Sequence, residues 1–334
     1  MKRVYYFDFL RAIAILSVLL VHSASPYLKD ISADSWGTIN FIDSIVRYSV
    51  PIFIMINGAL LLSKKDLILR TFIKKRFTRL LLPTFAWSLL YLFLYKSLAF
   101  DFTTLKAIFN APVYYHLWFM YMLISLYIAY PLLWAYTQKA NKSNLLYVLL
   151  AWFLLISVEP ALQKFYGINI GIRNEVFTYY MGYFLLGFFL STYNFSFKYS
   201  TILYGLLTLI LIWITAYGTE ILSQTKLNLY FYGNTSPNVI IMSVTVYLFF
   251  KEIPLAKIYE RFPSLDKLIM NVSHASLGVY LLHPIILNLI RHNSHFLSYS
   301  HSPVLQLWLS WSGTVIASFF IIYIIKKSPS KVVV

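Results

Sequence analysis

The feature that most limits the fold is a series of long apolar runs that repeats along the whole chain. About 20 helical residues are needed to cross the hydrocarbon core of a bilayer. Backbone groups in lipid must be satisfied within the segment, so repeated runs of this length predict α-helices. The ten predicted spans are 9–28, 40–62, 80–100, 116–136, 145–158, 176–193, 200–222, 235–250, 269–290 and 303–325, of which 145–158 and 235–250 are short and could be tilted, broken or re-entrant.

Composition leaves no room for a sizeable soluble domain. Of the 334 residues, 59% are hydrophobic and 12% are charged, and the mean hydropathy is +0.68. A soluble domain carries about 25% charged residues. We therefore expect an all-α integral membrane protein, a polytopic bundle of about ten transmembrane helices that forms one domain over residues 1–334. The chain has no cysteine, which excludes disulfides and thiolate chemistry.

The net charge of +16 does not indicate nucleic-acid binding, because the basic residues cluster in particular loops between spans. An even number of spans places both termini on one side. With this topology that side holds 19 Lys and Arg residues and the opposite side holds 8. The positive-inside rule then predicts that both termini are cytoplasmic.

Two ionisable residues, Arg11 and His22, lie inside the first apolar run, FLRAIAILSVLLVHS. An Arg at the centre of a span costs about 2.5–3.5 kcal/mol on insertion scales, so such residues usually face an interior and mark function. Eleven residues make three helical turns plus about 20°, which puts both side chains on one face, about 16 Å apart along the axis. Asp8 is three residues before Arg11 on the same face, either holding Arg11 in place or forming an ordinary interfacial ion pair.

Three histidines are expected at similar depth in the outer part of the bundle. With this topology His22, His116 and His283 fall there on spans one, four and nine. Histidine is the natural proton acceptor near neutral pH and suits general-base catalysis. For His116 and His283 an inter-helix packing role is equally plausible, whereas for His22 the shared face with Arg11 favours function. No metal site is predicted, since the histidines of the outer loop (His292, His295 and His301) match no compact zinc motif.

The segment SKKDLILRTFIKKRFTRLLLP, between spans two and three, carries seven basic residues and one acidic residue. Topology and anionic lipid would explain most of this charge. The sharper hypothesis is phosphate binding: Arg76 and Arg79 are three apart, share a helix face at the membrane entrance, and carry guanidinium groups that match phosphate geometry.

Five segments stand in this order along the chain: FDFLRAIAILSVLLVHS, RYSVPIFIMINGALL, FIKKRFTRLLLPTFAW, YHLWFMYMLISLYIAYPLLW and SLGVYLLHPII. Together they resemble the membrane acyltransferase-3 family, in its stand-alone form without an extracytoplasmic hydrolase-like domain. The resemblance covers the chain from end to end, and five weak matches in the right order are specific. One departure is visible, because Asn57-Gly58 stands where the family usually has Ser-Gly.

This resemblance implies an O-acetyltransferase in the inner (plasma) membrane of a bacterial cell. Its donor substrate would be acyl-CoA, most often acetyl-CoA, entering from the cytoplasm, with no tightly bound cofactor. Its acceptor would be a hydroxyl of a cell-surface glycan or lipid-linked sugar, and membrane lipids would surround it. His22 would act as base or be transiently acylated, together with Arg11. The donor side would use Arg11, Lys75, Arg76 and Arg79, and the acceptor side Arg47, Asn57, His116, Trp118, Tyr280 and His283.

Two other functions fit the same composition. A transporter or flippase of a glycan or lipid precursor would also have midplane polar residues and basic inner loops. A structural subunit of a polysaccharide-export complex would use the polar residues for packing alone and would tolerate substitution of Arg11 and His22. Neither the acceptor nor the oligomeric state follows from the sequence.

Overall fold

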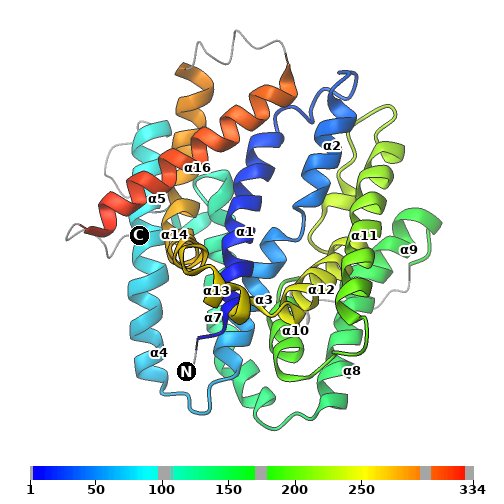
Figure 1. Cartoon of the computed structure of the whole chain (residues 1–334), viewed down its shortest axis with the longest axis vertical. Helices are drawn as coiled ribbons and strands as arrows, with labels where there is room; N and C mark the ends of the chain where they lie inside the picture. Colours follow the sequence, from blue (N-terminus) through cyan, green and yellow to red (C-terminus); the bar gives the residue numbers. More distant parts are fainter. Residues whose placement is uncertain (1–2, 97–105, 107, 170–178, 294–301, 328–334) are drawn as a thin grey trace.

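Helices account for nearly all of the regular structure in the part of the chain that the structure, a computed structural model, describes: residues 3–96, 106, 108–169, 179–293 and 302–327. Helix α1 lies in the middle of the bundle and packs against α3, α14 and α16 (Figure 1). The long helices and helical segments are α1 (Tyr5–Ala24), α2 (Trp36–Ile45), α3 (Ser49–Leu62), α4 (Leu69–Arg76), α5 (Leu82–Lys96), α7 (Trp118–Thr137), α8 (Lys142–Phe153), α9 (Glu159–Tyr166), α10 (Met181–Thr192), α11 (Ser200–Leu222), α12 (Pro237–Glu252), α13 (Leu255–Arg261), α14 (Pro263–Asn293) and α16 (Pro303–Lys327).

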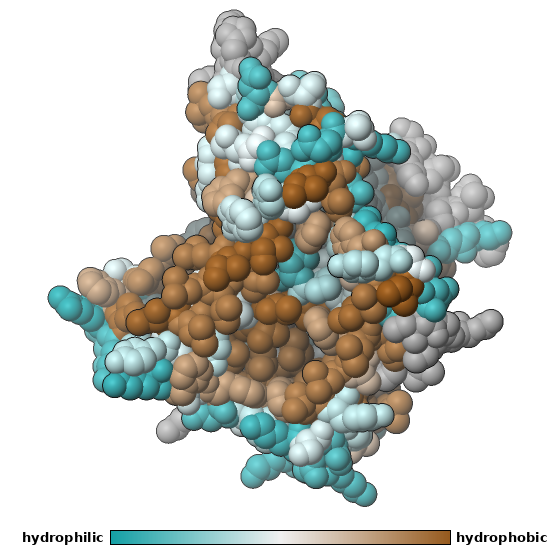
Figure 2. All heavy atoms as spheres, turned by 90° about the vertical axis from the view of Figure 1, so that its right-hand side faces the viewer, coloured by the Kyte–Doolittle hydropathy of each residue, from teal (hydrophilic) through white to brown (hydrophobic). Residues whose placement is uncertain are grey.

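Within the described residues, eight helical stretches are long and apolar enough to cross a membrane. A ninth is counted if the bent pair Tyr230–Glu252 and Leu255–Arg261, which meet at 53°, is one span. The remaining expected span, 176–193, corresponds to the 12-residue helix Met181–Thr192; residues 176–178 lie outside the described residues. Figure 2 shows hydrophobic residues gathered over the middle of one face, with hydrophilic residues along its lower edge. An apolar band of this kind is what a bilayer requires of a protein surface.

Prolines explain where several spans depart from regular α-helix. Pro83 and Pro160 each follow a π-helical turn, Phe77–Leu81 and Leu154–Val158 respectively. A proline has no N–H to donate to the carbonyl four residues earlier, so the preceding turn widens instead of breaking. The same loss at Pro51 leaves the carbonyl of residue 47 without its helical donor, which accounts for the break between α2 and α3.

Two sequence expectations are therefore wrong in their boundaries. The span expected at 145–158 is not short: it runs from Lys142 to Tyr166, 25 residues. The basic segment before residue 80 is not a loop, because the third span already begins at Leu69 and continues to Tyr95. The sequence pattern missed both because charged residues lower the local hydropathy without ending the helix.

Helices α3 and α10 approach each other backbone to backbone. A Cβ added to Gly58 would collide with the backbone of Phe184, and a Cβ added to Gly187 would collide with the backbone of Met55. Small residues at such crossings allow helices in membranes to pack closely. This contact fixes α3, which carries Asn57 at the site described below.

We expect Gly58→Ala to destabilise the folded protein by about 1–3 kcal/mol, because neither backbone can move aside without repacking the crossing. This cost outweighs the gain in helix propensity, about 1 kcal/mol for Gly to Ala. Thermal unfolding in detergent would measure the change. Gly37→Ala is the matched control, because nothing lies within 4 Å of the added methyl group; an equal loss of stability in both variants would contradict the close packing.

Candidate active site

Three helices bring five aromatic and imidazole rings together: α1, the start of α7 with the short turn before it, and α14. The rings of His22 and His283 stack with centroids 5.1 Å apart, and those of His116 and His283 are 5.5 Å apart. Tyr115 lies 5.1 Å from His22, and Tyr280 lies 5.3 Å from His116. The three histidines that the sequence placed at similar depth are thus neighbours. We call these five residues the ring layer.

Hydrogen bonds from side chains to backbone carbonyls hold the ring layer in place. Nδ1 of His283 lies 2.7 Å from the carbonyl oxygen of Tyr280, one turn earlier in α14. The hydroxyl of Tyr280 donates to the carbonyl of His116, which ties α14 to the start of α7. On the other side, Nη2 of Arg291 donates to the carbonyls of His22 and Ser23, at 2.8 and 3.1 Å. Arg291 therefore caps the last turn of α1, where carbonyls have no helical donor.

The histidines of the layer differ in exposure. His116 and His283 are fully buried, while His22 is only partly buried. Nε2 of His283 has no hydrogen-bond partner among the described residues. The same holds for both ring nitrogens of His116, although the carbonyl of Leu281 is close by. His22 lines the pocket described next, and the other two histidines do not.

That pocket, which we call the His22 pocket, has a volume of about 420 Å³ and lies at the end of the bundle where α1 finishes. Arg47, from the break between α2 and α3, points into it and forms an ion pair with the buried Asp43. The guanidinium of Arg47 also lies 3.7 Å from the centre of the Tyr232 ring. The lining includes Val21, His22, Lys29, Arg47, Tyr115, Leu227, Asn288 and Arg291.

A second pocket, the arginine pocket, lies on the other side of the ring layer and has a volume of about 220 Å³. It gathers three guanidinium groups from two parts of the chain, Arg11 from α1 and Arg76 and Arg79 from the segment before α5. Arg76 directly precedes the π-helical turn Phe77–Leu81, and Arg79 lies within it. Tyr280 belongs both to this pocket and to the ring layer. The lining of the pocket includes Arg11, Phe53, Asn57, Arg76, Arg79, Phe119, Tyr127, Ser276 and Tyr280.

Tyr127 links two of the residues that the sequence singled out. Its hydroxyl donates to Oδ1 of Asn57 at 3.0 Å and accepts from Nη1 of Arg76 at 3.4 Å. Its ring centre lies 4.7 Å from the guanidinium of Arg76. Asn57 therefore contributes to the arginine pocket, not to the His22 pocket as the acceptor-side expectation implied.

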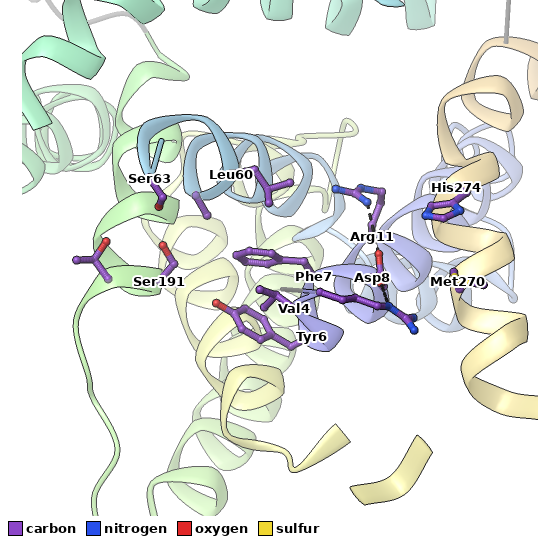
Figure 3. Close-up of a pocket in the computed structure, with 13 residues that line it drawn as sticks. Val4, Tyr6, Phe7, Asp8, Arg11, Leu60, Ser63, Ser191, Met270 and His274 are labelled. Carbon is purple, nitrogen blue, oxygen red and sulfur yellow. Dashed lines mark hydrogen bonds and ion pairs between the residues drawn. The ribbon is translucent and has the colours of Figure 1, made fainter. Parts of the chain in front are cut away.

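Arg11 is held by a small polar network at the start of α1 (Figure 3). Its Nη1 lies 3.7 Å from Oδ1 of Asp8 and donates to the hydroxyl of Ser273 at 3.1 Å. Asp8 also accepts from Arg3 at 2.7 Å. Arg3 in turn pairs with Asp266, and this hydrogen bond is the main reason that the pKa of Arg3 is raised above its ordinary value. The predicted contact between Asp8 and Arg11 is confirmed.

Arg11 also borders a larger cavity of about 630 Å³, drawn in Figure 3, between α1, the end of α3, the end of α10 and α14. The arginine pocket and this cavity thus share one side chain. Together they offer more room than the arginine pocket alone, with Arg3, Arg11, Arg76 and Arg79 around them.

Some of the expected site residues lie apart from this arrangement. Trp118 packs against Tyr180, with ring centres 5.5 Å apart, and lines neither the His22 pocket nor the arginine pocket. Lys75 is exposed on α4 and does not line the arginine pocket. His116 and His283 lie behind His22 and do not line the His22 pocket.

The sequence reasoning missed four residues that complete the geometry: Tyr115, Tyr127, Ser273 and Arg291. Tyr115 adjoins His116, and Arg291 is a cation at the end of a span, so weak signals existed for both. Nothing in the sequence pattern distinguishes Tyr127 from the other tyrosines of its helix. Among the described residues, no three His, Cys, Asp or Glu side chains are grouped so that they could hold a metal ion.

Comparison with known proteins yields one match. No curated protein and no solved structure matches the chain. A family model described as an acyltransferase domain matches residues 4–327, which include α1 to α16 and both pockets. A match over nearly the whole sequence confirms the family resemblance, and the chain belongs to the acyltransferase-3 family of membrane proteins.

Proposed function

We propose that this protein transfers an acyl group, expected to be acetyl, from cytoplasmic acyl-CoA to a hydroxyl of a cell-surface glycan or lipid-linked sugar. Family membership already favours acyl transfer over transport or a purely structural role. The proposal includes cytoplasmic termini, for which the 19-to-8 distribution of basic residues is the support.

One observation carries the proposal: a pocket with three arginines and a pocket with a partly exposed histidine approach the same ring layer from opposite ends of α1. Guanidinium groups suit the phosphates of a CoA donor, which they can bind in a bidentate manner. In this arrangement Arg11, Arg76 and Arg79 hold the donor phosphates. The larger cavity beside Arg11 provides room for the rest of the nucleotide.

His22 is then placed to act on the acceptor. In direct transfer its imidazole takes the proton of the sugar hydroxyl as the oxygen attacks the thioester carbonyl. The C–O bond forms, the C–S bond breaks, and the thiol of CoA leaves with a proton. His116 and His283 act by position: His283 stacks on the His22 ring and His116 supports His283.

A second route keeps the same groups but uses two steps. His22 first attacks the thioester, forms an acyl-imidazole and releases CoA. The sugar hydroxyl then attacks the acyl-imidazole, and neutral His22 is regenerated. Both routes remain part of the proposal, and rapid quenching followed by mass spectrometry of the peptide that contains His22 would distinguish them.

Membranes that contain the protein, supplied with radiolabelled acetyl-CoA, provide the test of function. We expect label in the glycan fraction that is lost on mild alkaline treatment, as an O-ester is. A strain without the gene is the control. Label that enters the glycan equally with and without the gene would contradict the proposal.

A further inference from the structure

The His22 pocket has an unusual charge for its position. With the proposed topology only eight Lys and Arg residues lie toward the outside of the bundle, and three of them, Lys29, Arg47 and Arg291, line this one pocket. The positive-inside rule disfavours cations there, so topology does not account for their grouping. No Asp or Glu is among the lining residues that the structure describes.

The three cations are not equally free. Arg47 is neutralised by its ion pair with Asp43, whose side chain is fully buried. Arg291 uses Nη2 for the carbonyls of His22 and Ser23, and among the described ion pairs it has no carboxylate partner. Its Nε is buried and donates no hydrogen bond to a described residue. Lys29 is exposed at the rim and has no described carboxylate partner either. Two positive charges therefore remain for a ligand.

The rest of the lining suits a saccharide. Tyr115 is half exposed, at 50%, and lies against His22, so its ring offers a face on which a sugar could stack. Asn288 is held by the hydroxyls of Tyr95 and Tyr114, at 3.1 and 2.7 Å, which leaves its carbonyl oxygen as an acceptor for sugar hydroxyls. Stacking and amide groups recognise any sugar, whereas the two cations select for charge.

The geometry points to an anionic acceptor: a saccharide that carries a carboxylate or phosphate within about one sugar unit of the hydroxyl that is acylated. Arg291 binds this group beside His22, and Lys29 attracts it at the rim. This inference rests on the proposed function and specifies its acceptor class. Because the charged group lies on the acceptor, its binding fixes which hydroxyl reaches His22.

The charge of the acceptor can be measured before its chemical structure is determined. Membranes from the native host are labelled with radioactive acetyl-CoA, and the label that depends on the gene is followed. The released glycans are separated by anion exchange at neutral pH; acetylation itself adds no charge. We expect the label in the retained fraction. Retention that is removed by phosphatase would identify a phosphate monoester, and retention that is removed by carbodiimide coupling of carboxylates to a neutral amine would identify carboxylate.

Label in the neutral, unretained fraction would overturn the anionic acceptor while leaving acyl transfer intact. Absence of gene-dependent label from every glycan fraction would instead refute the proposed function and the inference with it. The two failures are therefore distinguishable.

Variants test the residues with the acceptor so purified. We expect Lys29→Gln to raise the KM for the acceptor about fivefold, with kcat retained, and the difference to shrink at high salt. Lys226→Gln is the matched control, because Lys226 is exposed on the same side and does not line the pocket. Arg291→Lys should retain more activity than Arg291→Gln. Two results together would contradict the binding of the anionic group by Lys29 and Arg291. They are an unchanged KM in Lys29→Gln and equal activity of the two Arg291 variants.

Discussion

Replacement of His22 by alanine is expected to lower the rate of acyl transfer to glycan by about 10²–10⁴-fold, the usual contribution of a general base. The larger effect is expected if His22 carries the acyl group, since no other imidazole lines the His22 pocket among the described residues. The amount of folded protein should change little, because His22 is only partly buried at the last turn of α1. Initial rates in membranes, normalised to protein abundance, give the measurement.

The matched control is His292→Ala. His292 lies at the same end of the bundle, is exposed, and makes its hydrogen bond to the carbonyl of Asn288. It should retain full activity. Full transfer by His22→Ala at normal abundance would remove His22 from catalysis and would favour the packing role that the histidines could also fulfil.

The second large effect is expected when Arg76 and Arg79 are both replaced by alanine. A hydrogen bond to a charged group contributes about 1.5–3 kcal/mol, so loss of two should cost about 3 kcal/mol or more. This corresponds to a rise of about 100-fold in the Kd for acetyl-CoA. Isothermal titration with protein in nanodiscs would measure it, and the affinity of the unmodified protein should fall with salt.

Lys74 and Lys75 provide a charge-matched control, because both are exposed on α4 and neither lines the arginine pocket. Their double replacement by alanine should leave the affinity nearly unchanged. An equal loss in both double variants would mean that the segment acts through its overall charge. Unchanged affinity without Arg76 and Arg79 would refute their role in phosphate binding.

The sequence carries the fold class and much of the candidate site. Hydropathy alone locates the long helices. In the hydrocarbon core every backbone N–H and C=O group must be hydrogen-bonded within the segment, so a long apolar run has to be helical. The position of each polar residue within its span then places His22, His116 and His283 at one depth. In the structure their rings are in contact. The depth of a residue can be predicted from the sequence, because each residue advances a helical span by a fixed rise.

The arrangement of the spans within the membrane plane cannot be predicted in the same way. Which spans touch depends on small residues and on local helix irregularities, such as the close crossing at Gly58 and the π-helical turn after Arg76. Asn57 thus falls in the arginine pocket and Trp118 packs elsewhere, although the sequence predicts both on the acceptor side. The role of Arg291 could not be predicted from the sequence. Arg291 caps the end of α1 through the carbonyl of His22, which lies 269 positions away in the chain.

The ring layer also bears on the electrical integrity of the membrane. Two polar pockets that approach each other from opposite ends of a bundle bring solvent toward the same plane, and a continuous file of water between them would conduct protons. The stacked rings of His22 and His283, together with the contact between Tyr280 and the carbonyl of His116, occupy the space between the two pockets. If these rings position the acyl group as proposed, the same rings also keep water in one pocket from joining water in the other, so that acyl transfer across the membrane does not discharge the proton gradient.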